Sequence, residues 1–188
     1  KLPNLFIVAD GMGGHKAGDV ASRAAIEKFV KYACTTHMSD PANILDSGII
    51  SINKEIYDMA ISNKDYSGMG TTFVACSIVD NHVYIANVGD SRLYLIGRDI
   101  RQITRDHSLV EDMVRMGMID KEEAKTHYKK NVITKAIGVA DDRTATPDIF
   151  EIEISDGEKL LLCSDGLTNM VEDYEIKKIV TKNERIED

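Results

Sequence analysis

Two apolar segments, far apart along the chain, each run directly into an aspartate that is followed by glycine. LFIVA ends at Asp10, and KLLLCS ends at Asp165. Short apolar runs bounded by turn residues are typical of strands buried on both faces. A carboxylate at the end of such a strand is costly unless turn amides or a cation compensate its charge. The fold must therefore place two aspartates at the ends of its two most apolar strands.

The rest of the chain divides into paired helices and hairpins. Residues 19–33 and 42–62 carry apolar side chains at steps of three and four, which predicts two amphipathic helices. Residues 71–79 and 82–88 are β-rich runs separated by a two-residue turn signal, which predicts a hairpin. Further strands are expected at 91–97, 100–104 and 148–154, and further helices at 108–117, 120–127 and 172–180. This order, without regular strand–helix alternation, favours an α+β fold with antiparallel sheets.

Composition limits the class of protein. The 188 residues suffice for a single domain, with no linker-like or repetitive segment. A net charge of -8 argues against binding to nucleic acid, whose phosphates attract the opposite sign. No signal peptide or membrane-length apolar run is evident, so a soluble cytoplasmic monomer without membrane contact is expected. The three cysteines have no metal-binding or disulfide spacing and are expected to be free thiols.

A third carboxylate, Asp90 in NVGDSR, also stands at a strand–turn junction. Hydrogen bonds from turn amides are one way to compensate three such charges. The alternative is a metal, because carboxylate and carbonyl oxygens are the ligands that magnesium and manganese prefer. In that hypothesis Asp10 bridges two ions, and glycine at position 11 lets its carbonyl approach them.

Other phosphate chemistries lack their motifs in this sequence. The glycines after Asp10 fit neither a P-loop nor a dinucleotide-binding loop, where Lys16 would have to be glycine. No cysteine is followed at the right distance by the arginine that cysteine-based phosphatases need. No serine-nucleophile elbow and no zinc-binding histidine pair occurs.

The sequence resembles the metal-dependent Ser/Thr protein phosphatase family, type 2C, and its bacterial branch in particular. Family-like segments occur in family order along nearly the whole chain: VADGMGGHKAG, MGTTFVAC, NVGDSRLY, ITRDHSLVEDMVRMGMI, NVITKAIG and LLLCSDGLTNMV. The resemblance implies a four-layer sandwich, in which two antiparallel β-sheets pack face to face with helices on both outer sides. It also implies bacterial signalling through hydrolysis of phosphoserine and phosphothreonine on proteins, by attack of a hydroxide that bridges two divalent metals.

The same resemblance assigns the site. Asp10 and Asp165 are expected to be the catalytic carboxylates. Asp10, Gly11, Asp90 and Asp165 are expected to be the metal ligands, with Gly11 acting through its carbonyl. Two Mn²⁺ or Mg²⁺ ions are implied, and Asp90 would serve a third, weaker site. Expected partners are phosphoproteins, including a Ser/Thr kinase; an anti-sigma antagonist is an alternative substrate.

Three departures from the family pattern leave a second function open. By this resemblance, residues 1–188 are expected to form a single phosphatase domain that lacks the usual N-terminal strand and the C-terminal metal-ligand segment. Met12 stands where many eukaryotic members have a histidine that serves as general acid. The alternative is therefore a catalytically impaired phosphoprotein-binding or regulatory domain of the same fold. The segment from Leu109 to Lys130 is expected to form a surface flap that either selects substrates or is a solvated helical face.

Overall fold

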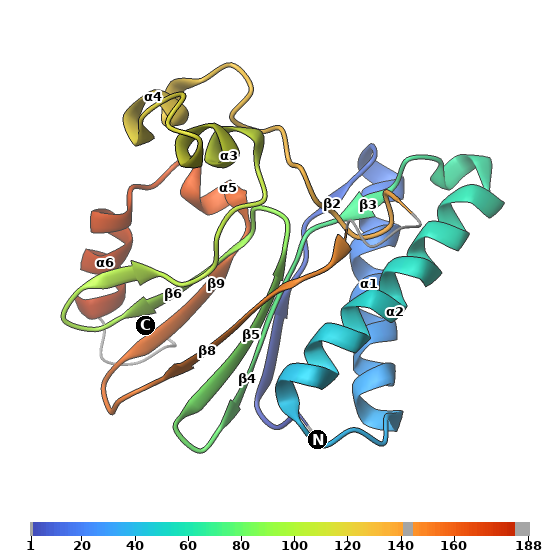
Figure 1. Ribbon diagram of the computed structural model, residues 1–188, viewed down its shortest axis with the longest axis horizontal. Coiled ribbons are helices and arrows are strands. Elements are labelled where there is room, and N and C mark those ends of the chain that lie inside the picture. The colour runs from blue at the N-terminus through green and yellow to red at the C-terminus, as the bar shows by residue number, and fades with distance from the viewer. Residues whose placement is uncertain (1, 141–144, 183–188) are drawn as a thin grey trace.

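The computed structural model of the protein describes residues 2–140 and 145–182. Two antiparallel sheets lie between layers of helices (Figure 1). The larger sheet has the order β1-β4-β5-β8 and comprises β1 (Leu5–Val8), β4 (Phe73–Val79), β5 (His82–Val88) and β8 (Asp148–Glu153). The smaller sheet has the order β7-β6-β9 and comprises β6 (Arg92–Ile96), β7 (Ile100–Gln102) and β9 (Lys159–Cys163).

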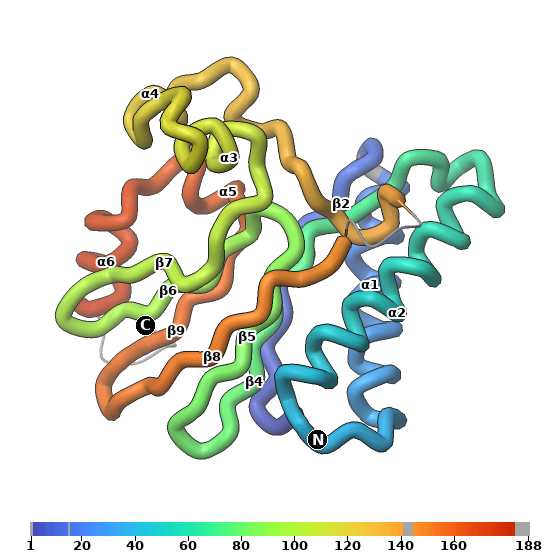
Figure 2. The backbone as a smooth tube through the Cα atoms, viewed as in Figure 1, coloured from blue at the N-terminus to red at the C-terminus, as the bar shows by residue number. Residues whose placement is uncertain are grey.

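Helices cover both outer faces of this pair of sheets, as the tube view also shows (Figure 2). The long helices α1 (His15–Thr35) and α2 (Pro41–Ser62) pack side by side on the larger sheet. Helix α6 (Asp173–Lys182) packs on the smaller sheet. The predicted four-layer sandwich is thereby confirmed.

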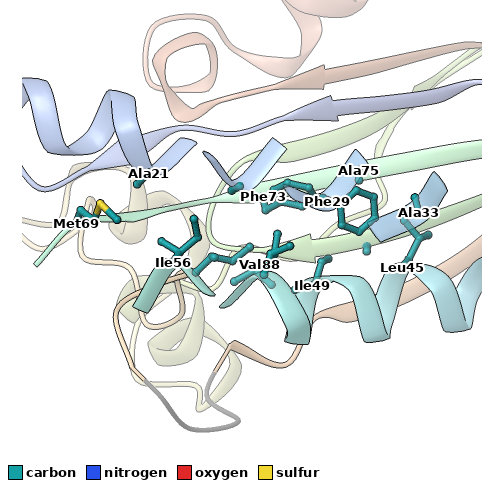
Figure 3. Close-up of a cluster of buried hydrophobic side chains, with 14 of the residues drawn as sticks. Ala21, Phe29, Ala33, Leu45, Ile49, Ile56, Met69, Phe73, Ala75 and Val88 are labelled. Atoms are coloured by element: carbon teal, nitrogen blue, oxygen red, sulfur yellow. The ribbon is translucent and has the colours of Figure 1, made fainter. Parts of the chain in front are cut away.

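Three separate apolar clusters fill the three interfaces between these four layers. The first joins α1 and α2 to the larger sheet, and Phe29 and Phe73 are in ring contact at its centre (Figure 3). The second lies between the sheets and contains Val74, Ile85 and Leu93. The third joins the smaller sheet to α6. Alternate strand residues enter opposite clusters because side chains along a strand point to opposite faces.

Shorter elements lie at one end of the sandwich. A two-residue ladder joins β2 (Gly11–Met12) to β3 (Gly70–Thr71). The flap carries α3 (Leu109–Arg115) and α4 (Lys121–Thr126), which lie over the end of the sheets where β9 leads into α5 (Asp165–Thr168) (Figure 1). A single 3₁₀ turn, η1 (Lys64–Tyr66), follows α2. Among the described residues, no helix is both long and apolar enough to cross a membrane.

The flap is attached through two neighbouring segments of backbone. An isolated bridge joins Ser108 to Ile133 just outside α3. The Leu109 N–H donates to the Val132 carbonyl at 2.8 Å. Capping by Ser108 and the capping box around α4 agree with the sequence, where both helix starts were expected. The flap is therefore a locally stabilised hairpin of helices that leaves and rejoins the sandwich at one place.

Three expectations about the elements were wrong in detail. The first apolar strand is not buried on both faces, because Phe6 of β1 is 53% exposed, whereas β9, although also an edge strand, packs into apolar clusters on both faces. Helix α1 begins at His15, before the predicted start at residue 19. Asp165 does not form a simple turn with its glycine but opens the short helix α5.

Candidate metal centre

Asp10 and Asp165 lie together at one end of the sandwich. Asp10 follows β1, and Asp165 follows β9 as the first residue of α5. Burial, the negative charge of Asp165 and a hydrogen bond shared with that carboxyl raise the pKa of Asp10 above its usual value, while a hydrogen bond from Ser164 opposes the rise. Two carboxyl groups close enough to share a proton repel each other when both are ionised. The fold thus creates a concentrated negative charge that a divalent cation would neutralise.

Asp90 extends this acidic centre from the loop between β5 and β6. Burial is the main cause that raises the pKa of Asp90 to about 6, followed by the negative charges of Asp165, Asp106 and Asp10. All three aspartates expected from the sequence are therefore electrostatically coupled. Asp106, on the loop before α3, was not identified as part of the site from the sequence.

The backbone at position 11 approaches a neighbouring helix very closely. A Cβ atom on Gly11 would lie 1.9 Å from the carbonyl oxygen of Gly18 in α1, so no other residue fits without moving the backbone. Glycine here allows β2 to pack closely on α1, whereas the sequence suggested that it lets its carbonyl approach metal ions. Its role as a carbonyl ligand stays a prediction.

A partly buried ion pair lies beside the carboxylates. The Arg92 guanidinium donates to both carboxylate oxygens of Asp106, with Nη2 and Oδ2 2.6 Å apart, and also to the Tyr94 hydroxyl. Burial alone would lower the pKa of Arg92, but the hydrogen bond and charge of Asp106 raise it above the usual value. Gln102 donates a further hydrogen bond to Asp106, and the Tyr94 hydroxyl donates to Asp173 at the start of α6. This network joins β6, the loop before the flap, and α6.

A cleft of about 550 Å³ opens between the flap and the smaller sheet. Asp90, Asp165 and Arg92 line its floor, and residues from α3, α4 and the start of α6 line the remainder. Its walls carry both signs of charge, with lysines from the flap opposite acidic groups. The centre is thus reached through an open groove beneath the flap.

The donor set fits hard divalent cations. Carboxylates are the preferred ligands of magnesium and manganese, and the raised pKa values of Asp10 and Asp90 reflect their burial and the negative charges of neighbouring carboxylates. In the described part of the chain, no group of three or more His, Cys, Asp or Glu side chains is close enough to hold an ion unaided. Two carboxylates, together with carbonyl and water oxygens, are therefore the set that these residues can offer.

His107 joins the base of the flap to the turn that carries Asp90. The main-chain N–H of His107 donates to the Gly89 carbonyl at 2.9 Å, and the Gly89 N–H donates to the imidazole Nδ1 of His107 at 3.1 Å. The Thr134 N–H donates to the His107 carbonyl, so the far end of the flap is also attached here. The His107 Nε2 lies 3.3 Å from Asp148, which also pairs with Lys135.

Acid is expected to destabilise the protein through His107. Burial and the positive charges of Lys135 and Arg105 lower the pKa of His107 below 6.5, although Asp148 opposes them. The unfolded chain then binds the proton more readily, so stability is complete above pH 6.5 and falls as the pH decreases below it. The slope from this group should be at most about 1.4 kcal/mol per pH unit. Urea unfolding of wild type and His107→Gln across this range measures it.

The exposed His37 offers the matched control. His37→Gln should retain the wild-type slope, whereas His107→Gln should flatten it. Equal slopes in wild type and His107→Gln would show that His107 does not titrate differently in the folded and unfolded states.

Comparison with known proteins shows which family the chain belongs to. Residues 2–186 match the family described as protein phosphatase 2C. The chain belongs to the protein phosphatase 2C family. A serine/threonine phosphatase from Listeria innocua is 46% identical over 181 residues, which cover 94% of this chain and 71% of that protein.

Solved structures of the protein phosphatase 2C type agree. A serine/threonine phosphatase from Staphylococcus aureus superposes with a TM-score of 0.91 and 41% identity, over 99% of this chain and 76% of that one. The catalytic domain of the phosphatase PstP, in complex with two manganese ions, gives a TM-score of 0.80 and 34% identity, over 93% and 73% of the two chains. The expected family, fold and enzyme class are confirmed: this is a metal-dependent protein-serine/threonine phosphatase.

The site also contains residues that sequence reasoning missed. The Asn169 side-chain amide donates to Asp165 Oδ2 at 2.9 Å. Asn169 stands four residues after Asp165, a spacing that places two side chains on one face of a helix and could have been noticed. Thr72 and Ser91 lie in two of the family-like motifs and were given no role. The Thr72 hydroxyl accepts from the Asp10 N–H and shares a hydrogen bond with the Ser91 hydroxyl.

Proposed function

We propose that Asp10 and Asp165 hold the divalent cations with which this phosphatase hydrolyses phosphoserine and phosphothreonine esters. The observation that carries this assignment is the meeting of these two carboxyl groups from opposite ends of the chain, with a raised pKa at Asp10. The Gly11 carbonyl and Asp90 would complete the protein's ligands, Asp90 at the weaker site.

When bound, manganese or magnesium would supply a nucleophile from water at neutral pH and would neutralise charge on the phosphoryl oxygens. The residues of the chain hold this centre in place. Asn169 orients the Asp165 carboxylate through its hydrogen bond. The cleft beneath the flap, which Asp90 and Asp165 line, would admit an extended segment of a phosphoprotein to the centre. Met12, which pairs with Gly70 in the β2–β3 ladder, offers no proton, so protonation of the leaving group falls to water or another group.

The impaired, regulatory alternative is less well supported. A centre without cations has no physical need for coupled carboxylates whose charges raise each other's pKa values. The enzyme is also proposed to act in the cytoplasm on phosphoproteins that include a Ser/Thr kinase. The free state of Cys34, Cys76 and Cys163 is consistent with a reducing compartment. Action as a monomer stays a prediction.

Removal and return of the metal test this function. Phosphopeptide hydrolysis by the wild type should cease in excess chelator and return with Mn²⁺. Asp165→Asn should need at least about 10-fold more Mn²⁺ for half-maximal activity, because even indirect partners of metal ligands are worth that factor. Asp156→Asn is the matched control, since Asp156 also precedes a glycine but lies in an exposed turn away from the centre. Hydrolysis that persists in chelator, with Asp165→Asn equal to wild type, would contradict the proposal.

A further inference from the structure

Thr72 lies between the two turns that carry Asp10 and Asp90. It directly precedes β4, is 3% exposed, and belongs to a Gly-Thr-Thr motif that the proposed function leaves without a role. Its neighbour across the turn, Ser91, is fully buried. Two buried hydroxyl groups at this place need a reason, because an apolar pair of the same shape would avoid the cost of burying them.

On one side, Thr72 holds the main chain of Asp10 through its hydroxyl and its main-chain N–H. The Asp10 N–H donates to the Thr72 Oγ1 at 2.9 Å. The Thr72 N–H donates to the Asp10 carbonyl at 2.9 Å, and that carbonyl also accepts from the Thr71 hydroxyl at 3.0 Å. The backbone that sets the direction of the Asp10 carboxylate is therefore fixed by this pair of threonines.

On the other side, Thr72 contacts the residues before and after Asp90. Its hydroxyl shares a hydrogen bond of 2.7 Å with the hydroxyl of Ser91. A Cβ atom on Gly89 would lie 2.7 Å from the Thr72 Cβ, and Gly89 has a φ of +105°, so the turn is packed directly against this threonine. The same side chain thus restrains both carboxylate-bearing turns.

We propose that Thr72 is a positioning residue that fixes the separation of Asp10 and Asp90, with the Ser91 hydroxyl as its partner. The inference rests on the proposed function, since it assumes that these aspartates bind cations. Removing the Thr72 hydroxyl frees one turn relative to the other, and the aspartates then no longer present their oxygens at one fixed spacing. Affinity for divalent cations therefore depends on a side chain that does not touch them.

Calorimetric titration of the protein with Mn²⁺ tests this role. Thr72→Val keeps the shape of the side chain but removes the hydroxyl, and it should raise the Kd for Mn²⁺ by about 10-fold to 100-fold. Thr72→Ser should restore a Kd close to that of the wild type, because it returns the oxygen. Ser77→Ala is the matched control: Ser77 is a fully buried hydroxyl on β4 that donates to the Pro3 carbonyl at 2.7 Å.

Thermal unfolding of the same variants separates positioning from ordinary stability. Ser77→Ala should lower the Tm and leave the Kd for Mn²⁺ unchanged, whereas Thr72→Val should change both. Thr72→Val with a wild-type Kd would overturn the inference. If that variant does not fold, Ser91→Ala decides, because it removes only the partner hydroxyl and should also raise the Kd; an unchanged Kd would overturn the inference.

Asp10→Asn in the same titration separates the positioning role of Thr72 from the assignment of Asp10 as a metal ligand. If Asp10→Asn weakens Mn²⁺ binding and Thr72→Val does not, only the positioning role of Thr72 is wrong. If Asp10→Asn binds Mn²⁺ as the wild type does, the metal assignment itself is wrong.

Discussion

Asp10→Asn should reduce kcat/KM for a phosphothreonine peptide by well over 100-fold, the upper end of the loss expected for an indirect partner of a metal. The amide keeps the size of the side chain but removes the negative charge. The Asp10 carboxylate is coupled to both Asp165 and Asp90, so the change removes one of the three coupled charges of the acidic centre. Steady-state hydrolysis with a saturating concentration of Mn²⁺ measures the loss.

The exposed Asp156 again serves as control, because Asp156→Asn removes the same charge from another Asp-Gly sequence. It should retain wild-type activity. Far-UV circular dichroism of both variants checks that the fold is intact. Comparable activity of Asp10→Asn and wild type would refute the assignment of Asp10 to the centre.

Arg92→Met is the change expected to cost the most stability, up to about 3 kcal/mol of the free energy of unfolding, the lower end of the loss for a fully buried ion pair. The Asp106 side chain is only 13% exposed, and without the guanidinium it loses its cationic partner and retains the hydrogen bond from the Gln102 amide. The network through Tyr94 to Asp173 would be broken as well. Urea unfolding at neutral pH measures the difference.

Two further variants make this prediction specific. Arg92→Met combined with Asp106→Leu should recover much of the lost stability, because replacing both members of a buried ion pair by apolar groups leaves no uncompensated charge. Arg23→Met removes an exposed i,i+4 pair with Asp19, worth at most about 0.5 kcal/mol. A double variant no more stable than Arg92→Met would argue against the unpaired Asp106 charge as the cause.

Long periodic segments of the sequence were sufficient to predict most of the fold. The steps of three and four in residues 42–62 reproduce α2, and the turn at Asp80 reproduces the β4–β5 hairpin. The errors fall where tertiary contacts decide. Apolar composition cannot distinguish a central strand from an edge strand, so the exposure of Phe6 was missed.

The candidate site was predictable only in part, for a similar reason. Asp10, Asp90 and Asp165 stood out because carboxylates at strand ends are costly. Arg92 and Asp106 did not, because no local pattern indicates that two residues on different segments form an ion pair. Thr72 was visible as part of a motif, but its position between two turns depends on the pairing of β1 with β4 and of β4 with β5.

The backbone of the flap leaves and rejoins the sandwich at a single place, with a side-chain ion pair from Lys125 to Glu172 as a further contact, and this has a consequence for the diversity of such enzymes. Residues 109–132 begin and end at adjoining positions of the Ser108–Ile133 bridge, so their length and sequence can change without shifting any strand of the sandwich. Evolution, or a protein engineer, can therefore exchange this segment as a cassette while the chemistry beneath it is inherited intact.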